Sequence, residues 1–340
     1  MNRIHLLGGL HPGLLWYKVR RIADFLNLGK RCFLVCQGEP QINRSCHVEG
    51  KLAVSDAIPE KDPQHPDHWQ NPEDLPASTY DDPPPNPSGG KTLIVDHANP
   101  DSYPKPSAAL KDSGPDDQIF IRPGTYEDRL FISDKPIHLL GAGRDRVQIF
   151  SRRSGPMYLQ RVPSGRISGI TFRYVGSDQH SAINILDSTC TIIHCRATEG
   201  ILSGVVIYGP QCRPSFLENE VCYNRESGIF CFAGAQPYIA KNTCFGNHHF
   251  GLAVRDDGTR PDLIKNLCRN NMLSGILLFH SAQALLLDNI CRDNYHWGLV
   301  MTPDCTTSPE TDQLPHANTL GQNPRGPLVV THEPLGEIGR

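Results

Sequence analysis

The sequence predicts an all-β solenoid, a parallel β-helix in which short strands stack as successive coils. The main observation is a glycine that recurs at intervals of 24, 23, 24 and 23 residues, at Gly204, Gly228, Gly251, Gly275 and Gly298. Other residue types keep constant offsets from these glycines, so several columns run in register. Self-similarity at such a period is typical of repeat architectures, in which each block is one structural unit.

Two asparagine columns precede the last four glycines. One lies four residues before them, at Asn224, Asn247, Asn271 and Asn294, and the other nine residues before them, at Asn219, Asn242, Asn266 and Asn289. Stacked asparagines can hydrogen-bond one another's side-chain amides along the axis. Glycine and asparagine both tolerate positive φ angles, so we expect them at the corners of the coils.

Apolar columns follow the glycines at the first and third positions. They run through Val205, Ile229, Leu252, Ile276 and Leu299, and through Ile207, Cys231, Val254, Leu278 and Met301. Alternate residues of a strand face the same side, so both columns are predicted to fill the interior. A further column, Cys244, Cys268 and Cys291, is expected to consist of buried packing residues rather than metal ligands.

The pattern divides the chain into four parts. Residues 1–36 are predicted to be helical, and residues 37–90 form a polar, proline-rich linker that cannot bury enough apolar surface to fold. Residues 91–302 carry the β-helix, and residues 303–340 are expected to be a flexible tail, in which the apolar run 328–330 could add an edge strand. Near residues 91–126, the order strand, short helix, strand resembles the opening coil of right-handed parallel β-helix proteins, the pectin-lyase-like solenoids.

Composition limits the partners and the compartment. The net charge is only -3, so no strong field favours nucleic acid or an anionic membrane surface. No apolar run approaches the length of a membrane-spanning helix. The chain has 12 cysteines and a poor signal peptide, so we expect reduced thiols and a cytoplasmic or nuclear location. No metal or cofactor site is expected.

The repeat resembles that of the carbohydrate-binding and sugar-hydrolase (CASH) group, which includes polysaccharide enzymes and eukaryotic F-box proteins built on β-helices. Residues 13–36 also resemble an F-box, the helical module that docks onto the Skp1 adaptor of cullin ubiquitin ligases, and the closing Leu34-Val35-Cys36 is the most similar part. The resemblance implies that Leu15, Ile22, Leu34 and Val35 contact Skp1.

The outward positions of the repeat strands indicate a binding face. If the first and third positions point inward, the second and fourth present an apolar ridge to the outside, and such a patch usually marks an interaction site. This ridge contains Tyr208, Phe230, Phe232, Arg255, Leu277 and Phe279. The preferred hypothesis is a non-enzymatic scaffold that binds a protein partner here, and the F-box resemblance implies the substrate-recognition subunit of a ubiquitin ligase.

The alternative is a carbohydrate-active β-helix enzyme, a polysaccharide lyase, hydrolase or epimerase. Hydrolysis of a glycosidic bond requires carboxylates that converge on one point. The best acidic pair is Asp256-Asp257 before Gly258, but neighbours along a strand point to opposite faces. An Asp-Asp-Gly sequence is more typical of a tight turn.

Overall fold

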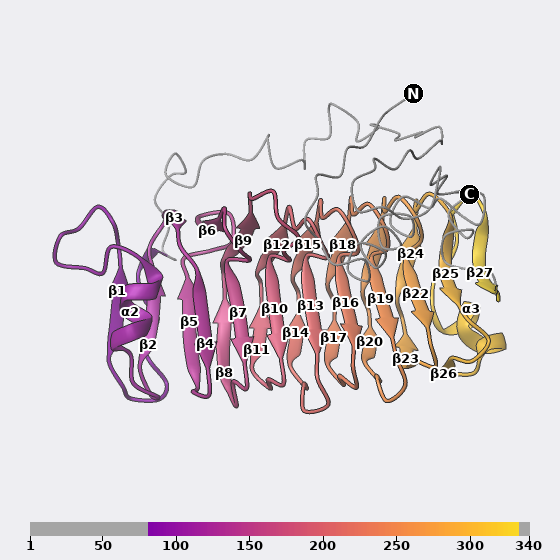
Figure 1. Ribbon diagram of the computed structural model, residues 1–340, viewed down its shortest axis with the longest axis horizontal. Coiled ribbons are helices and arrows are strands. Elements are labelled where there is room, and N and C mark those ends of the chain that lie inside the picture. The colour runs from indigo at the N-terminus through magenta and orange to yellow at the C-terminus, as the bar shows by residue number, and fades with distance from the viewer. Residues whose placement is uncertain (1–80, 333–340) are drawn as a thin grey trace, which may run out of the picture. The chain divides into compact units, whose positions relative to one another are not determined.

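The computed structural model describes residues 81–332, which form a right-handed parallel β-helix, as the repeat predicts (Figure 1). Each complete coil contributes one strand to each of three parallel sheets, called I, II and III in chain order, and the coils at the two ends contribute fewer. Sheet I holds β1 Thr92–Val95, β2 Gln118–Ile121, β5 Ile137–Gly141, β8 Gly165–Ser168, β11 Thr191–Ile193, β14 Ser215–Leu217, β17 Tyr238–Ala240, β20 Asp262–Ile264, β23 Gln283–Leu287 and β26 Thr306–Ser308. Sheet II holds β3 Gly124–Glu127, β6 Val147–Ser151, β9 Thr171–Tyr174, β12 Arg196–Thr198, β15 Glu220–Cys222, β18 Thr243–Phe245, β21 Leu267–Arg269 and β24 Ile290–Arg292.

Sheet III carries the outer face on which the aromatic side chains of the repeat strands lie. It holds β4 Leu130–Ser133, β7 Met157–Gln160, β10 Ile183–Leu186, β13 Val205–Tyr208, β16 Ile229–Phe232, β19 Leu252–Arg255, β22 Ile276–Phe279, β25 Trp297–Met301 and β27 Gly326–Val330. The strands pair in parallel and in register, so equivalent residues of successive coils stack at roughly 4.8 Å.

The short helix α2, Pro106–Asp112, packs against β1, β2 and β4 at the N-terminal end of the solenoid. Proline at the first helical turn suits a helix start, because the missing N–H has no partner there in any case. Ala109 and Leu110 are buried, so the helix covers apolar surface at the first coil. This confirms the short helix expected between the first two strands.

The interior columns lie where the alternation places them. In sheet III the first-position residues from Val205 to Leu299 and the third-position residues from Ile207 to Met301 are all buried. The interior column of sheet II runs from Val221 through Cys244 and Cys268 to Cys291, and these four side chains are fully buried in register. The column cysteines are therefore packing residues, and the cysteines that the structure describes are free thiols.

Both asparagine columns form hydrogen-bonded ladders. The side-chain amide of Asn242 donates to Asn266 Oδ1 at 3.0 Å, and Asn266 donates to Asn289 at 3.0 Å. Each amide also donates to a backbone carbonyl, as Asn266 does to Ile239 at 2.9 Å. The ladders continue past the repeat to Asn318 and Asn323, beyond the last recognisable glycine.

The expected role of the repeat glycines is wrong. Positive φ angles occur instead one residue before each asparagine, for example at Glu218, Lys241 and Lys265. A Cβ on Gly251 would lie 2.8 Å from the Cys268 sulfur and 2.8 Å from the Gly275 carbonyl oxygen. Close approach of neighbouring coils, rather than a left-handed backbone, explains why these positions are glycine.

Residues 306–330, assigned to the tail by the sequence, carry further structure. They contain β26, the 3-10 helix η4 Thr311–Gln313, the helix α3 Leu314–Ala317 and β27. The apolar run 328–330 does add an edge strand, because β27 pairs in parallel with β25. The predicted helix at 1–36, with Leu15, Ile22, Leu34 and Val35, lies outside the described residues, as does most of the linker.

Candidate functional site

Aromatic side chains follow the outer face of sheet III over several coils. We define the aromatic row as Phe131 on β4, Tyr158 on β7, Tyr208 on β13, and Phe230 and Phe232 on β16. Phe131 stacks on Tyr158 with ring centroids 5.3 Å apart, and Tyr208 stacks on Phe232 at 5.2 Å. Phe230 lies 5.0 Å from Phe232. The first two contacts are near-parallel stacks and the third is tilted by 33°, and aromatic pairs at these distances stabilise one another.

The row is accessible, most of all at its N-terminal end. Phe131 is 60% exposed, which is unusual for a phenylalanine held by stacking, and the other four rings are half-buried. Arg255 on β19 extends the row, because its guanidinium carbon lies 5.3 Å from the Phe230 ring centroid and 5.1 Å from that of Phe232. A cation over an aromatic face is attracted by the ring quadrupole.

Polar groups lie along the same face. The hydroxyl groups of Tyr158 and Tyr208 are 3.0 Å apart and share a hydrogen bond. Burial, followed by this hydrogen bond, raises the pKa of Tyr208 well above its ordinary value. The phenol of Tyr208 therefore keeps its proton at neutral pH.

Charged residues occupy the corner where sheet III ends. The residue directly after the strand is Asp134 for β4, Arg161 for β7 and Asp187 for β10, and all three have a positive φ angle. Arg161 donates two hydrogen bonds to Asp134, at 2.6 and 2.8 Å, and they hold the pKa of that carboxyl below its usual range. Arg161 also interacts electrostatically with Asp187 and with the Tyr158 hydroxyl. Two carboxylates, one guanidinium and two phenols thus gather on three neighbouring coils and β13.

The residues that the sequence assigns to the ridge lie on one face of sheet III and differ in exposure: Phe279 pairs in register with Arg255, and its ring stacks on Phe230 with centroids 6.4 Å apart. Tyr208, Phe230, Phe232 and Arg255 lie together on the half-buried outer face. Leu277 and Phe279 are on the same outer face but are only 2% and 8% exposed, so this part of the face is covered. The strand pleat decides on which side of the sheet a side chain lies, but it does not decide whether that side is covered.

The acidic pair Asp256-Asp257 forms a turn. Asp256 has a φ of 77°, and its carboxylate is paired with Arg255 at 3.0 Å and accepts the Ala233 N–H at 3.3 Å. Asp257 accepts the Gly258 N–H at 2.8 Å. Both carboxylates are thus held by turn hydrogen bonds or by the adjacent arginine.

Sequence reasoning missed Phe131, Asp134, Tyr158, Arg161 and Asp187. They precede Gly204, where the spacing of equivalent strand starts changes to 27, 26 and 22 residues. A usable signal was present all the same. Leu130-Phe131-Ile132 and Met157-Tyr158-Leu159 place an aromatic residue between two inward apolar residues, as Ile229-Phe230-Cys231 does.

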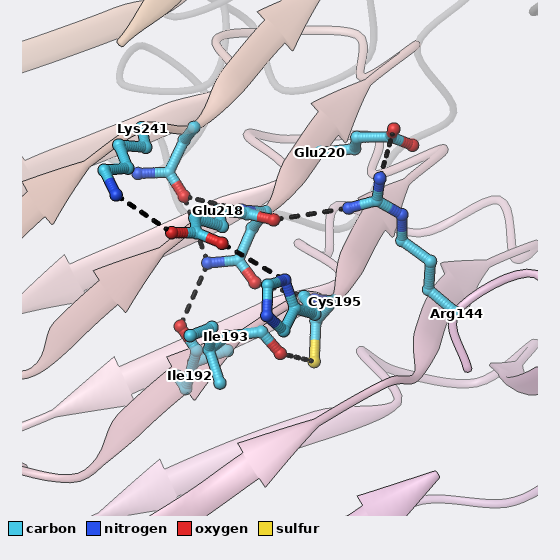
Figure 2. A network of polar contacts seen from close by, with 10 residues as sticks. Arg144, Ile192, Ile193, Cys195, Glu218, Glu220 and Lys241 are labelled. Carbon is cyan, nitrogen blue, oxygen red and sulfur yellow. Dashed lines mark hydrogen bonds and ion pairs between the residues drawn. The ribbon is translucent and has the colours of Figure 1, made fainter. Parts of the chain in front are cut away.

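A second charged cluster lies where sheet I turns into sheet II (Figure 2). Arg144 reaches Glu220 at 2.8 Å, and Arg196 contacts both Glu220 at 2.7 Å and Asp145 at 2.8 Å. Glu218 pairs with Lys241 at 3.3 Å on the neighbouring coil. The acidic and basic groups of this cluster neutralise one another, and the ion pairs connect successive coils.

Arg144 also extends the cluster along the solenoid. It lies in the loop before β6, yet it donates to the Glu218 carbonyl at 3.3 Å, three coils away. We therefore interpret this cluster as a clamp between coils rather than as a site. Within residues 81–332, no group of three or more His, Cys, Asp or Glu side chains is arranged to hold a metal ion. No helix in the same part of the chain is long and apolar enough to cross a membrane.

The solved structures that resemble the chain include three enzymes. The first is the pectate lyase Pel9A, with 13% identity, a TM-score of 0.40, and coverage of 72% of this chain and 80% of that chain. The second is the A-module of the mannuronan C-5 epimerase AlgE4 from Azotobacter vinelandii, with 16% identity, a TM-score of 0.41, and coverage of 59% of this chain and 69% of that chain. The third is a variant of the periplasmic alginate epimerase AlgG, with 13% identity, a TM-score of 0.37, and coverage of 64% of this chain and 57% of that chain. No curated protein sequence matches the chain.

These matches correct the preferred hypothesis of a non-enzymatic, protein-binding scaffold in a ubiquitin ligase. All three matched structures are polysaccharide lyases or epimerases, which is the class named in the alternative. The identities are 13–16% and the TM-scores are below 0.5, so the ligand of this protein is inferred below from its own residues alone.

The sequence itself agrees with the observed architecture. Residues 161–311 match the model of the right-handed β-helix region, and this stretch covers the coils from β8 to β26. The fold is therefore that of a right-handed parallel β-helix, and residues 161–311 are similar in sequence to the right-handed β-helix region.

Proposed function

We propose that this protein is a carbohydrate-active enzyme that binds a polysaccharide along the outer face of sheet III. The observation that carries the proposal is the aromatic row, whose rings lie on coils spaced at roughly 4.8 Å along one axis. The C–H faces of sugar rings are apolar and slightly positive, and they suit the negative faces of aromatic rings. A linear chain of sugars along the axis would meet one ring after another.

The polar border of the row favours a sugar over a purely apolar ligand. Sugars present many hydroxyl groups, and the carboxylates of Asp134 and Asp187 offer acceptors for them at the corner. Arg161 and Arg255 are partly exposed, with side-chain exposures of 53% and 35%, and each is paired with an aspartate. Guanidinium groups bind carboxylates in a fork geometry, so an acidic sugar could exchange with these aspartates. An acidic polysaccharide is therefore the proposed substrate class.

The test is a panel of acidic and neutral polysaccharides, with binding measured by calorimetry and turnover by the release of new chain ends. Phe131→Ala removes the most exposed ring of the row, and the lost stacking should weaken binding by roughly three- to tenfold. Tyr238→Ala on β17 is the matched control, because Tyr238 is also an exposed aromatic residue but lies on sheet I. Its affinity should equal that of the unchanged protein. Failure to bind or process any polysaccharide in the panel would refute the proposed function.

A further inference from the structure

A strip of apolar side chains follows the outer face of sheet I. This apolar strip consists of the last residues of five successive strands in register, Ile193 on β11, Leu217 on β14, Ala240 on β17, Ile264 on β20 and Leu287 on β23. The residue before each of them is buried in the core, so the strand pleat places the strip on the opposite, outer side. Its four large side chains are half-buried. A contiguous apolar surface of this kind is typical of an interaction site.

A row of charged and polar side chains borders the apolar strip. This corner row consists of the residues that directly follow the five strip residues, His194, Glu218, Lys241, Lys265 and Asp288. All five have φ angles between 54° and 58°, so their side chains leave the corner in the same direction, and these side chains are 40% to 66% exposed. Within one chain, Glu218 pairs with Lys241 at 3.3 Å (Figure 2). The corner row therefore presents charges of both signs beside an apolar surface.

The order of charges along the corner row becomes complementary to itself when it is reversed. A two-fold axis along β17 would place sheet I of a second copy on this sheet with the solenoid axes antiparallel, so each column would meet itself in reverse order. Glu218 would then face Lys265 of the second copy. The His194 imidazole would face the Asp288 carboxylate, which can accept its N–H hydrogen bond. Only Lys241 would meet its own counterpart, and the Glu218 carboxylate beside it in each chain offsets that repulsion.

The same charges select the position of the axis. With the axis on β14, Glu218 would face itself and His194 would face Lys241, so repulsive contacts would dominate. With the axis on β20, the contacts between Lys241 and Asp288 would be the attractive ones within the corner row, and Lys265 would face itself. The axis along β17 therefore gives the most complementary arrangement.

We propose that sheet I is the interface of a dimer of this chain, in which two copies pack antiparallel about a two-fold axis along β17. The apolar strips supply the buried surface, since Leu217 of one copy lies opposite Ile264 of the other and the small Ala240 lies at the axis. The corner rows fix the register of the two copies and disfavour other partners. Sheet III stays open in both copies.

The size of the contact implies a reversible dimer. The five strands span roughly 20 Å of the solenoid axis, and a strip of that length buries less than the roughly 800 Å² per partner of a standard interface. At the other edge of sheet I, Arg213 of each copy would face Arg260 of the other, which opposes association. We therefore expect a dissociation constant on the order of 10 µM.

Charge reversal tests the contact between Glu218 and Lys265. Sedimentation equilibrium of the full chain from about 1 to 100 µM measures the dissociation constant. Either Glu218→Lys or Lys265→Glu turns attractive contacts into repulsive ones and should raise this constant at least about tenfold. The double variant exchanges the two charges and should restore it to within about threefold of the unchanged protein. Lys111→Glu, at an exposed position of α2, is the matched control and should have no effect.

Both charge-reversal variants suit the fold. Lysine already occupies the equivalent left-handed position at Lys241 and Lys265, and glutamate occupies it at Glu218. The circular dichroism and thermal unfolding of the variants should therefore match those of the unchanged protein, so a change in sedimentation reports on association.

Chemical cross-linking tests the position of the axis. Sheets that pack face to face are roughly 10 Å apart, a span that a short bis-maleimide bridges between two thiols. Two copies of position 241 lie beside the axis, so Lys241→Cys should give a linked peptide that joins this position to itself, as identified by mass spectrometry. The natural cysteines that the structure describes are buried and should not react. His194→Cys is the matched control, because His194 is exposed in the same row but lies opposite Asp288 of the second copy.

The outcomes decide between this dimer and other arrangements. A monomer at every concentration overturns the interface, as does a dimer that both single charge reversals leave unchanged. Loss of the dimer in both single variants without recovery in the double variant overturns the antiparallel arrangement, as do links at position 194 that are as frequent as links at 241. None of these measurements involves a sugar, so they test the dimer independently of the proposed function.

Discussion

The asparagine ladders make a quantitative prediction about stability, which Asn266→Ala tests most sharply. Asn266 is fully buried and its side chain takes part in four hydrogen bonds. It accepts from the backbone N–H and the amide of Asn242, and it donates to the Ile239 carbonyl and to Asn289. Alanine removes all four and leaves the Asn242 N–H and the Ile239 carbonyl without these partners in the interior.

The size of the effect follows from these bonds. A buried hydrogen bond contributes about 1 kcal/mol net, and each buried polar group left unpaired costs about 1–3 kcal/mol. We therefore expect Asn266→Ala to lower the free energy of unfolding by about 4 kcal/mol. Gln211→Ala, which removes an exposed side-chain amide in the turn between β13 and β14, should change it by less than about 0.5 kcal/mol.

Urea unfolding followed by circular dichroism measures the difference. Both the midpoint and the slope are compared, because a change of slope would indicate that part of the solenoid unfolds separately. A loss below about 1 kcal/mol for Asn266→Ala, with an unchanged slope, would refute the reasoning. The ladder would then be a consequence of the stacking rather than a contributor to it.

Two further predictions concern packing and acid stability. Gly251→Ala should cost about 1–3 kcal/mol in thermal unfolding, because its Cβ would overlap the Cys268 side chain, whereas Gly321→Ala, whose Cβ meets nothing within 4 Å, should be neutral. Burial, and next the charge of His248, lowers the pKa of His249 to about 4, so the unfolded chain binds the proton first as pH falls. Stability should be fully present above about pH 6.5 and fall by about 3 kcal/mol towards pH 4. His249→Gln should flatten this acid dependence, whereas His316→Gln at an exposed position should leave it unchanged.

The period of the sequence predicts much of the fold because stacking imposes the same restraint on every coil. Inward residues such as Ile229 and Leu252 contact their equivalents one coil away, so the pattern repeats wherever the coil length repeats. The asparagine ladder has the same origin, since an amide at one level needs an amide at the next. A regular one-dimensional assembly therefore leaves a regular mark in the sequence.

The site is harder to read for the opposite reason. Its residues belong to coils of unequal length, and Tyr158 and Tyr208 occupy different outward columns that meet only because their side chains lean over β10. Exposure is also invisible to the pattern, as the buried Leu277 and Phe279 demonstrate. The glycine error is similar, because the period reveals that a small residue is needed but not whether φ or a neighbouring coil requires it.

The end of the ladder bears on self-association. A column of identical amides is a template for indefinite growth, since each level offers donors to whatever lies above it. Here the last amides turn back on their own chain. Asn318 donates to Leu286 and Leu314, and Asn323 donates to Cys291 and Leu320. The side-chain amide protons of Asn318 and Asn323 are thus all hydrogen-bonded within one molecule. The asparagine ladder therefore leaves no side-chain amide donor at this end to pair with the ladder of a second molecule.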